Sequence, residues 1–276
     1  MSIWKCSVGQ PSRPLSSWVC AYGGYEENTR FPVRRLEVPK DRVILILELG
    51  TRLQVGAVDT ESSPGQYDAF VVGLNGKPLI TEHSGVQCCI EVALFPWTVN
   101  RLFGRAANEF SQAVVNLEDI WGSEAHLLIE QLSEMSTWQE RFALVDRALL
   151  ERLTGSNQAI RPEIRWAWKT LEQENGCVSI RRLAKTIGWS DRHFAACFQR
   201  QIGITPKSAA RLIRFNHAHR RLNASDCDSL SEIAISCGYS DQSHFTREFR
   251  QFSGCSPKGY QKARFTDLLG IPADIV

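Results

Sequence analysis

Hydrophobic residues follow a two-residue period in the first third of the chain. From Arg34 to Leu94, apolar runs such as RVILILEL and AFVVGL alternate with polar positions, and short stretches rich in proline, glycine and asparagine separate them. This pattern is typical of half-buried strands joined by turns. It predicts about six short strands that form a small antiparallel β barrel or sandwich at about residues 30–95.

After Pro96 the hydrophobic period becomes that of helices. We expect helices at about residues 123–133 and 137–153, the second beginning with a capping box of Thr137 and Glu140. The apolar stripe of this helix comprises Phe142, Val145, Leu149 and Leu153. The stripe needs a packing partner, either the first part of the chain or a second subunit. Small polar residues at 154–159 then break the helical pattern. They divide the chain into an α+β part, residues 1–156, and an all-α part, residues 157–276.

One pattern occurs twice in the all-α part, as LAKTIGWSDRHFAACFQRQIGITP at 183–206 and LSEIAISCGYSDQSHFTREFRQFSGCSP at 230–257. Each copy has an apolar-striped helix, a glycine that permits a tight turn, and a serine, Ser190 or Ser240, that is expected to cap a second helix. The spacing between equivalent residues grows by one after the turn, so the second copy has an extra residue where its second helix starts. The pattern predicts helix-turn-helix units at about residues 179–203 and 229–254, joined by a linking helix at about 206–222.

The second helix of such a unit lies in the major groove of DNA, so its outer face should carry hydrogen-bonding groups. The candidate DNA-binding residues are Ser190, Arg192, His193, Ala195, Ala196, Gln199, Arg200, Ser240, Gln242, Ser243, His244, Thr246, Arg247 and Arg250. Arginine at 247 corresponds to alanine at 196, so the second unit offers more donors than the first. Solvated surface charge is the alternative interpretation of Arg192 and Arg247.

Charge separates the two parts of the chain. Up to Ser156 there are 14 basic and 19 acidic residues, a net −5, whereas the remainder has 18 basic and 11 acidic residues, a net +7. Only the all-α part is therefore suited to bind a polyanion.

Residues 160–265 resemble the DNA-binding domain of the AraC/XylS transcription regulators. The resemblance lies in the two units, the helix after Thr205-Pro206, and the stretch GYSDQSHF at 238–245, which continues to Phe249 and GCSP at 254–257. The first part, with VVNLEDIWG at 114–122, is similar to the sensor domain of such regulators, often a cupin-like β barrel with a helical dimerisation segment. The resemblance implies a bacterial, sequence-specific regulator that binds double-stranded promoter DNA as a homodimer. It also implies a response to an unidentified small-molecule effector, and RNA polymerase is a further candidate partner.

Two other classes of protein have to be considered. An enzymatic or DNA-repair domain fused to the DNA-binding part would need an activated nucleophile or a cofactor loop, yet the chain has no Cys-x-x-Cys, Gly-x-Ser-x-Gly or phosphate-binding glycine motif. A constitutive architectural DNA binder without a ligand remains open. We therefore expect no enzyme and no cofactor.

Few residues of the first part suggest a ligand site. Only His83 and His126 precede residue 157, so no metal site is expected. Glu82, His83, Cys88 and Glu91 are candidate polar anchors of a ligand pocket, although surface strand positions explain them equally well. Of the adjacent Cys88 and Cys89, one should face inward and one outward. The nine cysteines and the absence of a long apolar segment favour a cytoplasmic protein without a membrane span.

Overall fold

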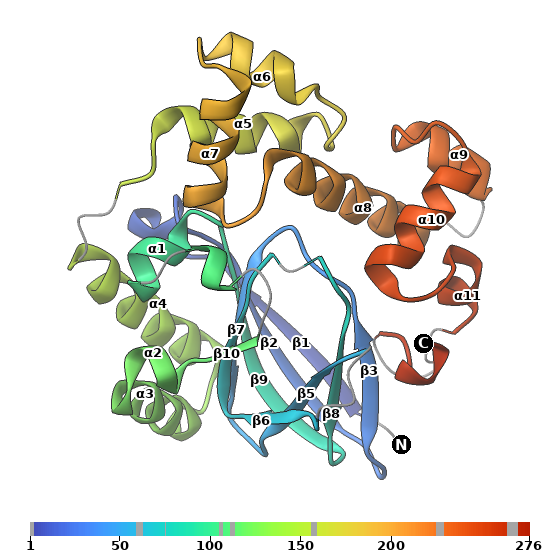
Figure 1. The fold of residues 1–276 in the computed structure, drawn as a ribbon. Coiled ribbons are helices and arrows are strands. Elements are labelled where there is room, and N and C mark those ends of the chain that lie inside the picture. Colours follow the sequence, from blue (N-terminus) through green and yellow to red (C-terminus); the bar gives the residue numbers. More distant parts are fainter. Residues whose placement is uncertain are drawn as a thin grey trace.

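The computed structural model describes residues 3–58, 63–74, 76–104, 107–110, 114–155, 159–224, 229–263 and 270–276. Two layers of antiparallel strands form the first part, and a set of helices forms the second (Figure 1). None of the described helices is long and apolar enough to cross a membrane.

The strands pair into two antiparallel sheets. The six-stranded sheet has the order β1-β2-β9-β4-β7-β10, and the four-stranded sheet has the order β3-β8-β5-β6. Their bounds are β1 (Ile3–Gly9), β2 (Val19–Asn28), β3 (Val33–Glu37), β4 (Val43–Glu48), β5 (Leu53–Ala57), β6 (Gly65–Tyr67), β7 (Ala69–Val72), β8 (Leu79–His83), β9 (Val86–Leu94) and β10 (Val114–Asn116). No ladder joins the two sheets among the described strands, so of the two predicted arrangements they form the sandwich, and the closed cupin-like barrel that the resemblance implied is wrong.

The first two strands lie before the region where strands were expected. β2 contains Gly23 and Gly24, which weaken the two-residue pattern. A side chain at position 24 would collide with Trp138, whose ring atoms lie as close as 2.3 Å to the place of a Cβ. Packing against a distant helix therefore requires a glycine that strand propensity disfavours.

One face of the six-stranded sheet is covered by the helices that follow the strands (Figure 1). These are α1 (Thr98–Phe103), α2 (Glu118–Trp121), α3 (Ser123–Glu134) and α4 (Trp138–Thr154), with 3-10 turns at η1 (Arg13–Leu15) and η2 (Ala107–Phe110). The predicted capping box of Thr137 and Glu140 is present at the start of α4. The apolar stripe of α4 is buried in its own chain: Tyr22, for example, stacks on Phe142. The stripe is thus not available to a second subunit, contrary to the dimer interface considered from the sequence.

The all-α part contains both expected helix pairs. Its helices are α5 (Pro162–Gln173), α6 (Ile180–Thr186), α7 (Asp191–Ile202), α8 (Pro206–Ala224), α9 (Leu230–Ser236), α10 (Gln242–Ser253) and α11 (Pro257–Lys262), and η3 (Ala273–Ile275) follows near the C-terminus. Ser190 caps α7 as predicted, and Ser179 and Ser229 cap α6 and α9. Asp241, and not Ser240, caps α10, because its carboxylate accepts the backbone N–H of His244 at 2.7 Å. The extra residue of the second copy thus shifts the cap by one position.

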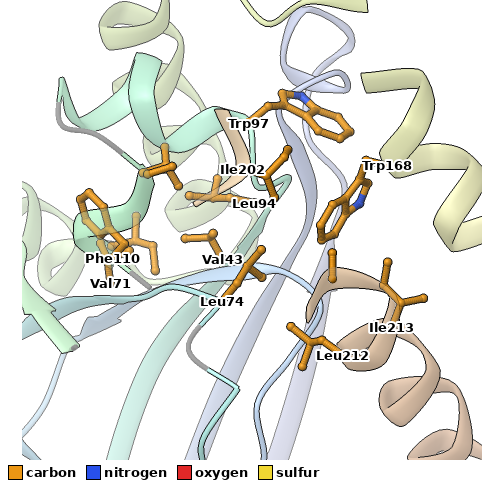
Figure 2. Close-up of a cluster of buried hydrophobic side chains, with 14 of the residues drawn as sticks. Val43, Val71, Leu74, Leu94, Trp97, Phe110, Trp168, Ile202, Leu212 and Ile213 are labelled. Carbon is orange, nitrogen blue, oxygen red and sulfur yellow. The ribbon is translucent and has the colours of Figure 1, made fainter. Parts of the chain in front are cut away.

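The two parts share one hydrophobic core. Figure 2 shows Val43, Val71 and Leu94 of the sheet in one hydrophobic cluster with Trp168, Ile202 and Leu212 of the helices. The proposed boundary after Ser156 lies outside the described residues. Because the packed surface is continuous, a displacement of α8 relative to the sheets would disturb the packing of both parts.

Candidate DNA-binding surface and ligand cavity

Each pair of helices turns at a glycine with a left-handed backbone. Gly188 and Gly238 have φ values of 73° and 77°, which residues with a Cβ rarely adopt. α8 separates the two pairs, with α6 and α7 near one of its ends and α9 and α10 near the other (Figure 1). The 19 residues of α8 give it a length of about 28 Å. This length is close to one turn of DNA, about 34 Å, and suits two recognition helices on one face of a duplex.

On α7, the candidate residues lie on the side away from the core. Phe194, Cys197 and Phe198 are buried, whereas Arg192, Ala196 and the candidates in the helical turn at 199–200 are exposed and Ala195 is half-buried. His193 is exposed, and its ring packs edge-on against that of Trp189, with ring centroids 4.7 Å apart. The exposed surface of α7 combines a positive charge with a methyl group and an amide.

On α10, the same arrangement presents more polar groups. Gln242, Ser243, Arg247 and Arg250 are exposed, and His244 and Thr246 are half-buried. Gln242 accepts a hydrogen bond from Ser231 of α9 through its Oε1, and Ser240 hydrogen-bonds with His244 and Asp241. Side chains at the start of α10 are therefore held in place before any ligand binds, while the two arginines extend from an exposed face.

A buried ion pair fixes α10 to α8, and it was not anticipated from the sequence. Glu248 is 5% exposed and accepts from Arg211 Nε at 2.7 Å and from Arg214 Nη2 at 2.8 Å. Arg214 also lies over the ring of Tyr239, 4.8 Å from its centroid. Glu248 is three residues after the inward Phe245, a spacing that places it on the buried face and could have revealed it. These two arginines of the linking helix are therefore half-buried and engaged in packing α10 against α8.

The space between the two sheets contains a cavity of about 300 Å³. Its walls come mainly from the inner faces of both sheets, and α8 and α11 contribute His219 and Tyr260. The apolar part of the wall consists of Trp4, Tyr25, Leu36, Val38, Pro39, Ile44, Ile46, Val55, Phe70, Val72, Leu79 and Cys89. A pocket of this size, lined by both parts of the chain, is at the lower end of the range for small-molecule sites.

The structure separates the four candidate ligand anchors. Glu91 lines the cavity, where both carboxylate oxygens accept from Lys40 Nζ at 2.8 Å. His83 is buried behind the wall, with Nε2 3.1 Å from Arg35 Nη1, and burial lowers its pKa to about 4. Glu82 instead pairs with Arg34 at the half-exposed edge of the sheet, 3.8 Å apart. The fourth candidate, Cys88, faces Arg141 of α4 at 3.8 Å.

Cys89, which was not a candidate, lines the cavity and is 5% exposed. The expectation that one of the two adjacent cysteines faces inward is confirmed by this placement. Burial raises the pKa of the Cys89 thiol, so the thiolate is disfavoured. Cys89 therefore contributes an apolar, unreactive surface.

Contacts between the two parts surround the cavity. Asn216 Nδ2 of α8 donates to the carbonyl of Pro39 at 3.1 Å, and Arg42 forms an ion pair with Glu172 of α5. The backbone N–H of Leu36 donates to the carbonyl of Ile271 at 2.9 Å, so the segment at residues 270–276 lies along β3. Val276 in turn lies against Gly254 at the end of α10. The C-terminal segment thus links the cavity wall to the second helix pair.

Comparison with known proteins supports the interpretation of the helical part. Residues 183–263 match the family model described as helix-turn-helix domain. The chain is 36% identical over 84 residues to the probable transcriptional regulator LumQ of Photobacterium leiognathi, a match that covers 30% of this chain and 34% of LumQ. It is 39% identical over 64 residues to the transcriptional activator RhaS of Pectobacterium carotovorum, a match that covers 23% of each protein.

These matches span about a third or less of the length of the curated relatives, and only 12% for uncharacterised regulators of Staphylococcus aureus. A crystal structure of ToxT from Vibrio cholerae bound to (E)-4-(8-methylnaphthalen-1-yl)but-3-enoic acid is similar along most of the chain, with a TM-score of 0.50 and 9% identity. That match covers 94% of this chain and 98% of ToxT. The likeness shows a shared fold that includes the sheets of the first part.

Proposed function

Since its C-terminal part is a helix-turn-helix DNA-binding domain of the AraC/XylS family, we propose that this chain is a sequence-specific regulator of transcription. In this proposal α7 and α10 bind two successive major-groove segments on one face of promoter DNA. The observation that carries the proposal is the pair of capped helices with exposed polar faces, held apart by the 19 residues of α8. Residues 157–276 form the DNA-binding domain and residues 1–156 the sensor domain.

The proposed contacts follow from exposure and chemistry. Arg192, Arg247 and Arg250 supply charged donors that suit guanine edges or phosphates, and Gln199 and Gln242 supply amides. Ala195 and Ala196 allow close approach or contact with a thymine methyl group. The backbone N–H groups at the start of each recognition helix suit phosphate oxygens.

Footprinting of the full chain on its promoter tests this function. Two protected patches about ten base pairs apart on one face are expected. A double variant, Arg247→Ala with Arg250→Ala, should lose the patch bound by α10 and keep the other. A matched control is Lys169→Ala, an exposed basic residue of α5 that belongs to neither recognition helix. A single patch for the wild-type chain would contradict the proposal.

The first part is proposed to sense a small molecule in the cavity between its sheets. The support is that His219 and Tyr260 of the helical part complete the cavity wall, so an occupant would contact both parts of the chain. A ligand that binds one arrangement of the two parts better than another shifts the population of DNA-binding forms. DNA titrations with and without a bound ligand should give different affinities for DNA. Identical affinities would contradict the sensor role of the cavity but not the DNA-binding function.

A homodimer remains a prediction. The apolar stripe of α4 is already buried, so any interface has to use other surfaces of the first part. Sedimentation of the full chain at micromolar concentration, with and without DNA that carries repeated sites, tests the assembly. A monomer in both conditions would refute it.

A further inference from the structure

The cavity between the sheets has an apolar wall, but its polar groups are specific enough to define the chemistry of a ligand. This inference rests on the proposed sensor function and names the class of molecule that the cavity would take. One face of the six-stranded sheet packs on helices, and the other, with Ile44, Ile46, Phe70 and Val72, faces the cavity. A cavity of 150 Å³ holds benzene, so the 300 Å³ here would hold about 12 non-hydrogen atoms.

Charged groups at the wall already have opposite charges beside them. Glu91 holds Lys40 through both carboxylate oxygens, and Glu27 holds Arg35. The next cation along the wall, Arg42, pairs with Glu172 and lies 3.7 Å from Asp41. Lys77 also has an interaction partner, and His219 hydrogen-bonds with Tyr260 at 2.8 Å. A charged ligand would therefore lose its hydration without gaining an unpaired counter-charge.

Burial disfavours the negative charge of Glu37, the remaining acidic residue of the wall. Burial raises the pKa of its carboxyl group, and the hydrogen bond that it accepts from Thr81 Oγ1 is long at 3.4 Å. The neutral form of Glu37 is thus favoured relative to an exposed glutamate. Glu37 is therefore a less favourable counter-charge for an ammonium ligand than an exposed carboxylate would be.

One acceptor in the wall lacks a donor. Glu27 is 5% exposed; its Oε2 accepts from Arg35, whereas its Oε1 is buried and has no hydrogen-bond partner among the described residues. Leaving a buried charged acceptor unsatisfied costs free energy, which a ligand donor would recover. β2 and β3 both contribute to this corner of the cavity, since they carry Glu27 and Arg35.

From these observations we propose that the cavity binds an uncharged, mostly apolar molecule of about 12 non-hydrogen atoms that donates one hydrogen bond to Oε1 of Glu27. The apolar body lies against Ile44, Ile46 and Phe70. The single donor gives the ligand its orientation, as sparse polar groups do in apolar pockets.

Four probes of matched size separate the alternatives by calorimetric titration of the full chain near neutral pH. They are para-butylphenol, para-butylanisole, para-butylbenzoate and para-butylbenzylammonium. The phenol is neutral and has a donor, the anisole lacks the donor, and the other two carry a negative and a positive charge. The phenol should bind at least about tenfold more tightly than each of the others, since a hydrogen bond to a charged group is worth about that factor or more.

Two variants locate the binding. Val72→Phe places a larger side chain in the cavity wall and should weaken phenol binding at least about tenfold, because the added ring competes for the same volume. Val86→Phe changes a 50% exposed valine outside the cavity and should leave binding unchanged. DNA titrations of the same samples show whether each variant is folded and whether the regulator function holds, independently of the probes.

Tighter binding of the benzoate or the benzylammonium would overturn the proposal, and so would equal binding of the anisole and the phenol. Binding of the phenol that Val72→Phe leaves unchanged, in a variant that still binds DNA, would place the ligand elsewhere. If no probe binds while the wild-type chain still protects two patches of DNA, the ligand proposal fails and the DNA-binding function stands.

Discussion

Removing the carboxylate of Glu248 should loosen the second recognition helix without affecting the first. The carboxylate bridges Arg211 and Arg214 of α8, and truncation of one member of a buried ion pair typically costs about 3–5 kcal/mol. The arginine side chains are 33% and 16% exposed, so water would compensate for part of the loss. For Glu248→Ala we therefore expect about 2–3 kcal/mol, with a smaller effect for Glu248→Gln, which keeps an acceptor.

Native-state hydrogen exchange measures this effect on each helix separately. A loss of 2–3 kcal/mol corresponds to about a 30- to 150-fold drop in the protection of amides in α10. Amides of α7 serve as the internal control. Gln251→Ala is the matched variant, because Gln251 bonds the same Arg211 at an exposed position and its loss should matter little.

DNA binding by α10 should weaken in this variant, whereas DNA binding by α7 should not. In Glu248→Ala the patch of DNA protected by α10 should fade at protein concentrations that still protect the α7 patch. Unchanged exchange in α10, or an equal loss of protection in both helices, would refute the idea that this ion pair holds the second unit in place.

Further predictions concern the recognition surface, the buried carboxyl of β4 and the C-terminal segment. Arg247→Ala should lower affinity for the cognate site and relax preference at one or two base pairs, by about 1–3 kcal/mol, whereas Ala196→Ser should change specificity little. Titrations on cognate and scrambled duplexes at two salt concentrations check this, and uniform weakening with a flatter salt dependence would assign Arg247 to a phosphate. Burial raises the pKa of Glu48 from 4.5 to about 8, so the folded state holds a proton that the unfolded state releases, and the free energy of unfolding should fall as the pH rises through this range. Glu48→Gln should remove that fall. In urea titrations at about pH 5 and pH 8.5, the free energy of unfolding of the variant relative to that of the wild type should therefore be higher at pH 8.5 than at pH 5. The same difference in free energy at both pH values would contradict the assignment. Ile271→Asp, at a position 2% exposed, should release the C-terminal segment from β3 and increase protease sensitivity there, and resistance equal to that of the wild type would show that the segment is held by other contacts.

Local signals made the helical part predictable. The serine caps at 179 and 229, and the positive-φ glycines of both turns, are encoded within a few residues of each helix. The cap of α10 was misplaced because Ser240 and Asp241 are adjacent and both can cap; the insertion in the second copy favours the aspartate. Local competition between neighbouring residues limits the precision of such predictions.

The ligand cavity was beyond sequence reasoning for a different reason. Glu27, Arg35 and His83 lie on three separate strands, and only the pairing of the sheets brings them together. Glu27 belongs to β2, which was not predicted because its glycines weaken the strand pattern. Tyr260, which also lines the cavity, lies more than two hundred residues later in the sequence. Of the four anchors chosen from the sequence, Glu91 alone reaches the cavity, because alternation predicts the face of a strand but not what lies opposite it.

The core that joins the two parts also bears on how such a protein can change through recombination. Trp168, Ile202 and Leu212 belong to the helical part, yet they pack in one cluster with Val43 and Leu94 of the sheets (Figure 2). A helical part transferred onto an unrelated sensor would bring these apolar side chains to a surface that had not co-adapted to them. Exchange between relatives should therefore succeed when the crossover carries the facing sheet residues along, and fail to give a foldable hybrid when it does not.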